Sequence, residues 1–265
     1  MKIVSILLVA AAVYGFQRFR FPSDSSRVNS EYEWEMQNPA EDPPDAREKA
    51  EFAFARLRYR GYGGWRRSSW GTDSNKAERQ FLQGVRRLTR IHARSVEHIV
   101  DADSDDMFNW PWLYAVEVGH WELNERQARR LRDYLDRGGF LMVDDFHGTY
   151  EWQVFEASLR RIFPDRPIEE IEDQEVIFRS LYDLDKRFQV PGRRYLYSGR
   201  TWEQDGVEAR WRAVYDDRRR IQVAICHNMD LGDAWEWADY PAFPEPFASL
   251  AYRIGLNYVV YAMTH

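Results

Sequence analysis

Strand-like and helix-like segments alternate along this sequence from about residue 49 to its end. Three segments with alternating or continuous apolar residues are typical of strands: 52–59, 112–118 and 140–143. Each is followed by a segment with apolar residues at helical spacing: 74–89, 124–137 and 151–163. This alternation predicts strand–helix–strand units, and therefore an α/β fold with a mostly parallel sheet.

Two segments near the C-terminal end have a different pattern. Residues 209–215 and 221–226 are both strand-like and flank the charged run 216–220, which predicts an antiparallel hairpin. Residues 246–263 are apolar on nearly all sides, which is typical of a buried helix. Arg253 interrupts that apolar segment, so we do not expect it to span a membrane.

The first 48 residues differ in composition from the rest. The apolar run 3–14 is too short to span a bilayer and fits the apolar part of a secretory signal peptide. We expect residues 1–15 to be this signal, with cleavage before Phe16; the alternative is a short, uncleaved membrane anchor. Residues 16–48 are rich in Ser, Pro, Asp and Glu and predict a flexible linker, which leaves 49–265 as a single domain.

Charge and cysteine content exclude several classes of protein. The chain has 37 Lys+Arg against 43 Asp+Glu and a net charge of -6, so it lacks the basic excess that nucleic-acid binding requires. The single cysteine, Cys226, excludes a disulfide framework and multi-cysteine zinc sites, and we interpret it as a buried core thiol. The glycines at 61–64 match neither a Walker loop nor a dinucleotide fingerprint.

Polar side chains gather where the predicted strands end, which is where open α/β sheets bind ligands. Asp144, Asp145 and His147 follow the strand at 140–143, and a second polar run follows the strand at 221–226. We expect these side chains to line one cleft. The expected ligand-binding residues are Trp70, Asp73, His120, Asp144, Asn228, Asp230, Asp233 and Trp235.

Asp145, His147 and His227 are the candidate catalytic residues. A carboxylate and an imidazole supply a general acid/base pair or ligands for a metal. Because neighbours on a strand point to opposite faces, we expect only one of Asp144 and Asp145 to face the cleft. Simpler roles stay open, since Asp is a common helix cap and Asn and Asp often shape turns. A metal held by His227, Asp230 and one residue of the first group would match no recognised zinc motif.

Five stretches of the sequence resemble a bacterial family described only as domain of unknown function 4159. They are residues 54–59, 70–73, 138–145, 227–236 and 257–265, which together span nearly the whole domain. That family is similar to the class I glutamine amidotransferase-like fold, so the resemblance implies a flavodoxin-like three-layer α/β sandwich. Amidotransferases carry a Cys on the tight elbow after a central strand, whereas this sequence has Asp144-Asp145 there. The resemblance therefore implies the fold without amidotransferase activity.

The sequence favours an exported, periplasmic domain that binds a small polar ligand, such as a carbohydrate or a cell-envelope component. One alternative is a hydrolase that uses Asp145 with His147 or His227, with or without a metal; another is a protein-interaction module of the cell envelope. A hydrolase needs the carboxylate and the imidazole to converge in a pocket, whereas an interaction module needs an apolar patch on the order of several hundred Å². Membrane contact is expected only through the N-terminal segment, if it stays uncleaved.

Overall fold

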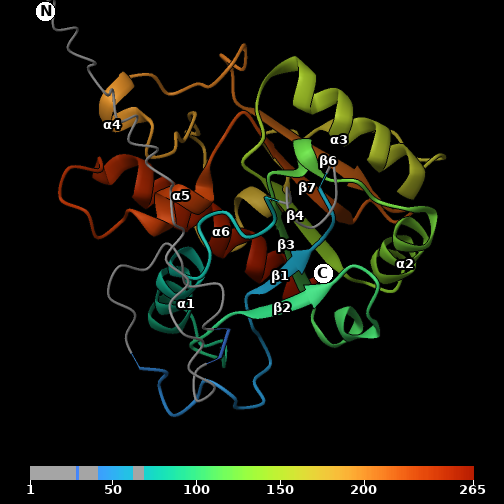
Figure 1. The fold of residues 1–265 in the computed structure, drawn as a ribbon, viewed down its shortest axis with the longest axis horizontal. Helices are drawn as coiled ribbons and strands as arrows, with labels where there is room; N and C mark the ends of the chain where they lie inside the picture. The colour runs from blue at the N-terminus through green and yellow to red at the C-terminus, as the bar shows by residue number, and fades with distance from the viewer. Residues whose placement is uncertain (1–27, 30–40, 62–68) are drawn as a thin grey trace, which may run out of the picture.

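The computed structural model describes residues 28–29, 41–61 and 69–265 of the chain. Within them, seven strands form one sheet in the order β2-β1-β3-β4-β7-β6-β5 (Figure 1). The strands are β1 (Ala55–Arg58), β2 (His98–Asp101), β3 (Trp112–Val116), β4 (Phe140–Asp144), β5 (Glu169–Glu170), β6 (Arg210–Tyr215) and β7 (Ile221–His227). The predicted signal at 1–15 and most of the predicted linker lie outside the described residues.

Five neighbouring strands of the sheet are parallel. β1 pairs with β2 and β3, and β4 pairs with β3 and β7, all in parallel. The order β2-β1-β3-β4-β7 is the 2-1-3-4-5 order of flavodoxin-like folds. β6 and β7 form the predicted antiparallel hairpin, and the short strand β5 pairs antiparallel with β6 at the edge. The predicted fold class is therefore confirmed.

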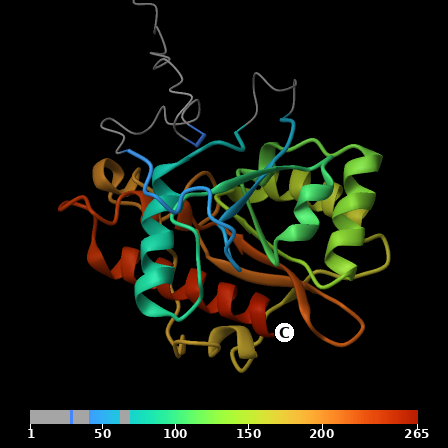
Figure 2. The ribbon, with the colours of Figure 1, turned by 90° about the horizontal axis from the view of Figure 1, so that it is seen from below.

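Helices cover both faces of the sheet (Figures 1 and 2). α1, α5 and α6 pack on one face, and α2 and α3 pack on the other, which makes three layers. Of the described helices, none is long and apolar enough to cross a membrane. The helices are α1 (Lys76–Leu88), α2 (Glu125–Asp136), α3 (Gly148–Ile162), α4 (Tyr195–Ser198), α5 (Leu231–Glu236) and α6 (Glu245–Thr264), with short 3₁₀ turns η3 (Asp105–Asn109), η4 (Val118–His120) and η5 (Val176–Phe178).

The sequence of β4 reflects its place at the centre of the sheet. Phe140 and Met142 belong to the core under α1, α5 and α6, whereas Leu141 and Val143 belong to the core under α2 and α3. Because both faces are covered, the strand is apolar throughout instead of alternating with polar residues. The carboxyl end of β4 thus lies at the middle of one edge of the sheet.

The chain leaves neighbouring strands β1 and β3 toward opposite faces. β1 leads to α1 on one face, and β3 leads to α2 on the other. In doubly wound sheets, this divergence opens a crevice at the carboxyl ends of the strands, where ligands bind. The loops after β1, β3, β4 and β7 all reach this edge, so the fold brings their polar residues to one region.

Candidate functional site

Asp145, the first residue after β4, lies at a sharp turn of the chain. Its φ is 51°, in the left-handed region that most L-residues avoid and that Asp and Asn adopt more readily. The Asp145 N–H donates to the Met229 carbonyl at 3.1 Å. In the same way, the Asn228 N–H donates to the Phe146 carbonyl at 3.0 Å. The loops after β4 and β7 are therefore fastened to each other, with Asp145 beside the residues that follow β7.

Asp144, the last residue of β4, fastens the strand to α5. Its Oδ2 accepts a hydrogen bond from the Tyr114 hydroxyl at 3.0 Å, and it accepts two more from the N–H groups of Leu231 at 2.8 Å and Gly232 at 3.0 Å. Burial raises the pKa of Asp144 to about 7, and the three donors limit that rise. Asp144 is thus bonded to the start of α5, whereas an oxygen of Asp145 lies within 4.8 Å of oxygens of Asp73 and Asp230.

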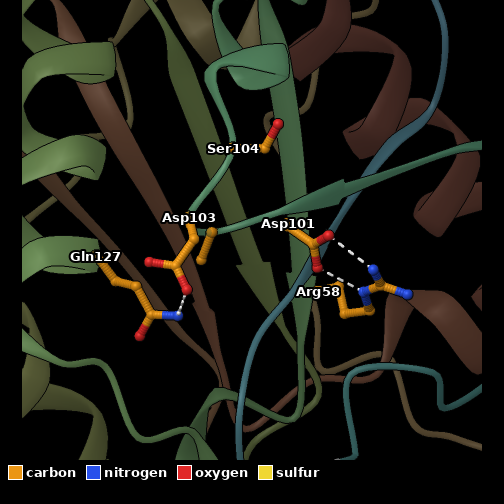
Figure 3. A pocket seen from close by; sticks show the side chains of 6 residues that line it. Arg58, Asp101, Asp103, Ser104 and Gln127 are labelled. Carbon is orange, nitrogen blue, oxygen red and sulfur yellow. Dashed lines mark hydrogen bonds and ion pairs between the residues drawn. The ribbon is translucent and has the colours of Figure 1, made fainter.

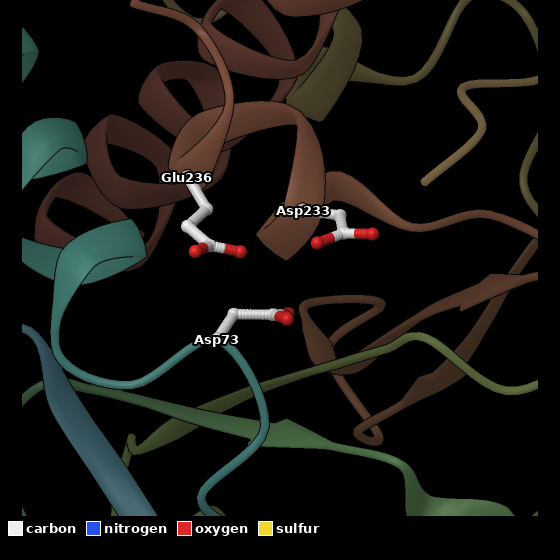
Figure 4. Close-up of side chains that lie close together, drawn as sticks. All are labelled: Asp73, Asp233 and Glu236. Atoms are coloured by element: carbon white, nitrogen blue, oxygen red, sulfur yellow. The ribbon is translucent and has the colours of Figure 1, made fainter. Parts of the chain in front are cut away.

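Five carboxylates from three segments of the chain meet at the carboxyl edge of the sheet. We call them the carboxylate cluster: Asp73, Asp145, Asp230, Asp233 and Glu236. One oxygen from each of Asp73, Asp145 and Asp230 lies within 4.8 Å of the other two, and the same holds for the group of Asp73, Asp233 and Glu236. Figure 4 shows the second group, in which Asp73 from the loop before α1 faces two carboxylates from α5. Asp73 belongs to both groups and is therefore the centre of the cluster.

Three members of the carboxylate cluster, Asp73, Asp145 and Asp230, are buried away from any ion pair with the described lysines and arginines. Asp73, Asp145 and Asp230 are 3%, 8% and 6% exposed, and no lysine or arginine of the described residues forms an ion pair with them. Two carboxylates 4.8 Å apart repel each other by about 3.5 kcal/mol at an effective dielectric constant of ~20. Burial, and then the neighbouring carboxylates, raise the pKa values of all three well above their usual range. At neutral pH this group needs protons or a cation to balance its charge.

Two glycines let the backbone close around these carboxylates. Oδ2 of Asp73 is buried and has no hydrogen-bond partner. A Cβ at Gly232 would lie 2.7 Å from this oxygen, and a Cβ at Gly192 would lie 2.1 Å from Oδ2 of Asp230. Both distances are shorter than any ordinary contact, so a larger residue at either position would displace a carboxylate. Glycine therefore preserves the geometry of the cluster from two sides.

His147 lies next to Asp145 at the start of α3. Its Nε2 is 3.2 Å from Oδ1 of Asp145, and its backbone N–H donates to Oε2 of Glu151 at 2.5 Å. Burial lowers the pKa of His147, so the ring is neutral at pH 7. The structure thus brings together two of the three candidate catalytic residues, an acid with a raised pKa and an imidazole with a lowered one.

His227, the third candidate catalytic residue, lies away from the carboxylate cluster. Its ring stacks on Phe146 with the ring centres 4.8 Å apart, and its Nε2 is 3.2 Å from the Gly148 carbonyl. Burial lowers its pKa to about 4. The structure therefore does not group His227 with Asp230, and neither of the two groups of possible metal ligands in the described residues contains a histidine.

Asn228 holds the loops together. Its side-chain oxygen accepts from the Gly148 N–H at 2.8 Å, and its side-chain NH₂ donates to the Glu208 carbonyl at 2.7 Å. Its φ of 64° is again in the left-handed region, where Asn is tolerated. All of its polar side-chain atoms are thus used in positioning the loop after β7 and the first turn of α3.

The remaining expected ligand-binding residues, His120, Trp70 and Trp235, are not members of the carboxylate cluster. His120 bonds through Nδ1 to Oε2 of Glu117 at 2.6 Å, and this hydrogen bond raises the pKa of the imidazole. Trp235 is fully buried against Phe54, with ring centres 5.9 Å apart. Trp70 is 6% exposed, so neither Trp offers an open ring face for stacking on a sugar.

Sequence reasoning missed Glu236 as a site residue. Asp230, Asp233 and Glu236 are spaced three residues apart, which places acids along one side of a helical turn. This spacing is the signal that identifies Glu236, but it depends on recognising α5 as a helix. Cys226 is fully buried in β7, and burial raises the pKa of its thiol well above the usual range, so the predicted core thiol is confirmed.

A cavity apart from the carboxylate cluster lies near the carboxyl ends of β1 and β2 (Figure 3). It has a volume of about 550 Å³, and its polar lining residues bond to one another. Arg58 forms two hydrogen bonds with Asp101, at 2.5 and 2.6 Å, and Gln127 donates to Asp103 at 3.1 Å. These four side chains already bond to one another in pairs, so the carboxylate cluster is the stronger candidate site.

Comparison with known proteins identifies the family of this chain. The model of a family described as domain of unknown function (DUF4159) matches residues 53–263. The chain belongs to this family. The resemblance noted in the sequence is therefore confirmed, and the DUF4159 match contains every residue of the carboxylate cluster. No curated protein matches the chain.

Proposed function

We propose that this DUF4159 domain binds a small polar ligand that brings positive charge to the carboxylate cluster. One observation carries this proposal: Asp73, Asp145 and Asp230 are buried within 4.8 Å of one another without an ion-pair partner from the described lysines and arginines. Burying carboxylates in this way destabilises a fold, and such costs persist mainly at functional sites. The position at the carboxyl ends of β1, β4 and β7 is where this fold class binds ligands.

The same geometry argues against amidotransferase chemistry. Asp145 occupies the turn directly after the central strand, where the resemblance to amidotransferases would require a cysteine. Cys226, the single cysteine of the chain, lies in the core of β7 with a raised pKa, which disfavours the reactive thiolate. A nucleophilic thiol is therefore missing from the place where the chemistry needs it.

Unfolding experiments on the full chain test whether the cluster serves a ligand. We expect Asp73→Asn to stabilise the ligand-free protein by about 1–2 kcal/mol, because it removes one buried charge at little cost in shape. Asp217→Asn, at an exposed aspartate in the β6–β7 turn, is the matched control and should change little. Thermal shifts with glucosamine, putrescine and CaCl₂, and with glucose as the neutral comparison, then probe binding.

A charged probe that raises the melting temperature of the wild type but not of Asp73→Asn supports the proposal. If Asp73→Asn is instead less stable than the wild type, the cluster stabilises the fold as it stands, and the proposal fails. If no probe shifts the melting temperature and Asp73→Asn stays neutral, there is no binding site for positive charge, and the proposal fails as well.

The contact between Asp145 and His147 favours hydrolysis as a second candidate function. Their 3.2 Å separation places a carboxyl with a raised pKa next to an imidazole with a lowered pKa, which is the arrangement of a general acid with a general base. We expect any turnover of p-nitrophenyl acetate or p-nitrophenyl glycosides to fall at least about 100-fold in His147→Gln. Turnover that persists unchanged in this variant would exclude the pair from the reaction.

We also propose that the domain works outside the cytoplasm. The proposal rests on the apolar run at residues 3–14, whose length suits a signal peptide. Expression of the full chain in a bacterium, followed by fractionation and N-terminal sequencing, is the test. A periplasmic product that begins at Phe16 supports export and cleavage, whereas a cytoplasmic product that retains Met1 contradicts both.

A further inference from the structure

We propose that a hard divalent cation, Ca²⁺ or Mg²⁺, binds between Asp73, Asp145 and Asp230. This inference rests on the proposed function and names the charge that the ligand site takes up. The three residues come from the loops after β1, β4 and β7, so the fold itself brings them together at the carboxyl edge of the sheet.

The geometry of the three oxygens fits one shared ion. They lie within 4.8 Å of one another. Calcium binds oxygen ligands at roughly 2.3–2.6 Å. Two oxygens on opposite sides of one ion are therefore separated by about twice this distance, which is close to the 4.8 Å limit found here. A set made only of carboxylates selects hard cations such as Ca²⁺, Mg²⁺ and Mn²⁺ over zinc, which prefers nitrogen and sulfur ligands.

Asp73 supplies an independent indication of a ligand. It is 3% exposed, and its Oδ2 is buried with no hydrogen-bond partner. A buried carboxylate oxygen is almost always satisfied by a donor, because leaving it unpaired is costly. Gly232 lies beside this oxygen, and a Cβ at that position would come within 2.7 Å of it. A cation that accepts this oxygen as a ligand would satisfy it.

The second group, of Asp73, Asp233 and Glu236, is the weaker site for an ion. Asp233 is only half-buried, and its Oδ2 accepts a hydrogen bond from the Arg193 N–H at 2.6 Å. Asp233 is therefore more open to solvent than Asp73, Asp145 and Asp230, which are all buried. Asp230 uses Oδ1 to accept from the Asp233 N–H at 2.9 Å, and its Oδ2 lies beside Gly192.

Titration calorimetry on the full chain tests the inference. The protein is first treated with a chelator and then titrated with CaCl₂, MgCl₂ or MnCl₂ at pH 7.5. We expect one ion per chain and a loss of affinity of at least about tenfold in both Asp73→Asn and Asp145→Asn, since even residues that only orient metal ligands usually contribute that much. Asp217→Asn is the control with unchanged affinity, and circular dichroism shows that each variant is folded.

The outcomes separate this inference from the proposed function. Tight binding that is weakened in both cluster variants supports the cation. If no ion binds at millimolar concentration while Asp73→Asn still stabilises the ligand-free chain, the cation is excluded and the ligand site stands. If no ion binds and Asp73→Asn destabilises the chain, both proposals fail. If binding is lost in Asp233→Asn but kept in Asp145→Asn, the ion belongs to the second group and the assignment is overturned.

Discussion

Replacing Asp144 with alanine tests whether this residue fastens β4 to α5. The substitution Asp144→Ala removes one carboxylate oxygen that accepts from the Tyr114 hydroxyl and from the N–H groups of Leu231 and Gly232. Each buried donor left without a partner costs about 1–1.7 kcal/mol, so the three together cost about 3–5 kcal/mol. For a domain of this size, each kcal/mol lowers the melting temperature by about 2–4 °C. We therefore expect a decrease of about 6–20 °C.

Chemical denaturation at pH 7 measures this loss directly. We expect the midpoint in urea to fall in Asp144→Ala while the slope stays constant, which would indicate a change in stability alone. The matched control is Asp144→Asn, whose amide oxygen can accept from the same three donors and should cost less than about 1 kcal/mol. If alanine and asparagine cost equally little, Asp144 does not hold α5, and its carboxylate would have to be reconsidered as a ligand of the cluster.

Three further predictions concern the carboxylate cluster and its loops. The stability gained in Asp73→Asn should grow between pH 5 and pH 8 in urea titrations. A carboxyl with a raised pKa keeps its proton in the folded state, so the wild-type protein loses stability as pH rises through that pKa. A gain independent of pH would contradict this. Gly192→Ala should cost about 1–3 kcal/mol and weaken Ca²⁺ binding, because its Cβ would lie 2.1 Å from Oδ2 of Asp230; unchanged calorimetry would argue against the site. Asn228→Ala should lower the unfolding free energy by about 1–3 kcal/mol through the unpaired Gly148 N–H, whatever ligand is present; a loss of binding at unchanged stability would instead make Asn228 a ligand residue.

The fold could be predicted because its strongest signals are local. The continuous apolar residues of β4 and the helical spacing in α2 each depend on a few neighbours in sequence. The box of reciprocal hydrogen bonds between Asn124 and Gln127 confirms the predicted start of α2. In contrast, the edge strand β2 (His98–Asp101) carries half-buried polar residues and shows no apolar alternation, so the sequence pattern does not reveal it.

The candidate site could be predicted as a region but not in detail. Because β4 and β7 are parallel, the polar residues that follow them must meet at one edge of the sheet. Which of them converge depends on the left-handed turn at Asp145 and on the hydrogen bonds that pull its loop toward Met229. His227 stacks on Phe146 and belongs to neither group of carboxylates. Such long-range contacts leave no mark in the spacing of residues along the chain.

The hydrogen bonds between the loops after β4 and β7 also bear on selectivity. Asp145 N–H to Met229 O and Asn228 N–H to Phe146 O continue the pairing of the two strands beyond the sheet itself. Carboxylates mounted on backbone that is held in this way move little toward a bound ion, so the size of the space between them is set before anything enters it. Mg²⁺ demands oxygens at about 2.1 Å, whereas Ca²⁺ accepts longer and less regular contacts. A preorganised frame of this kind would discriminate between ions by radius if the proposed cation binds there.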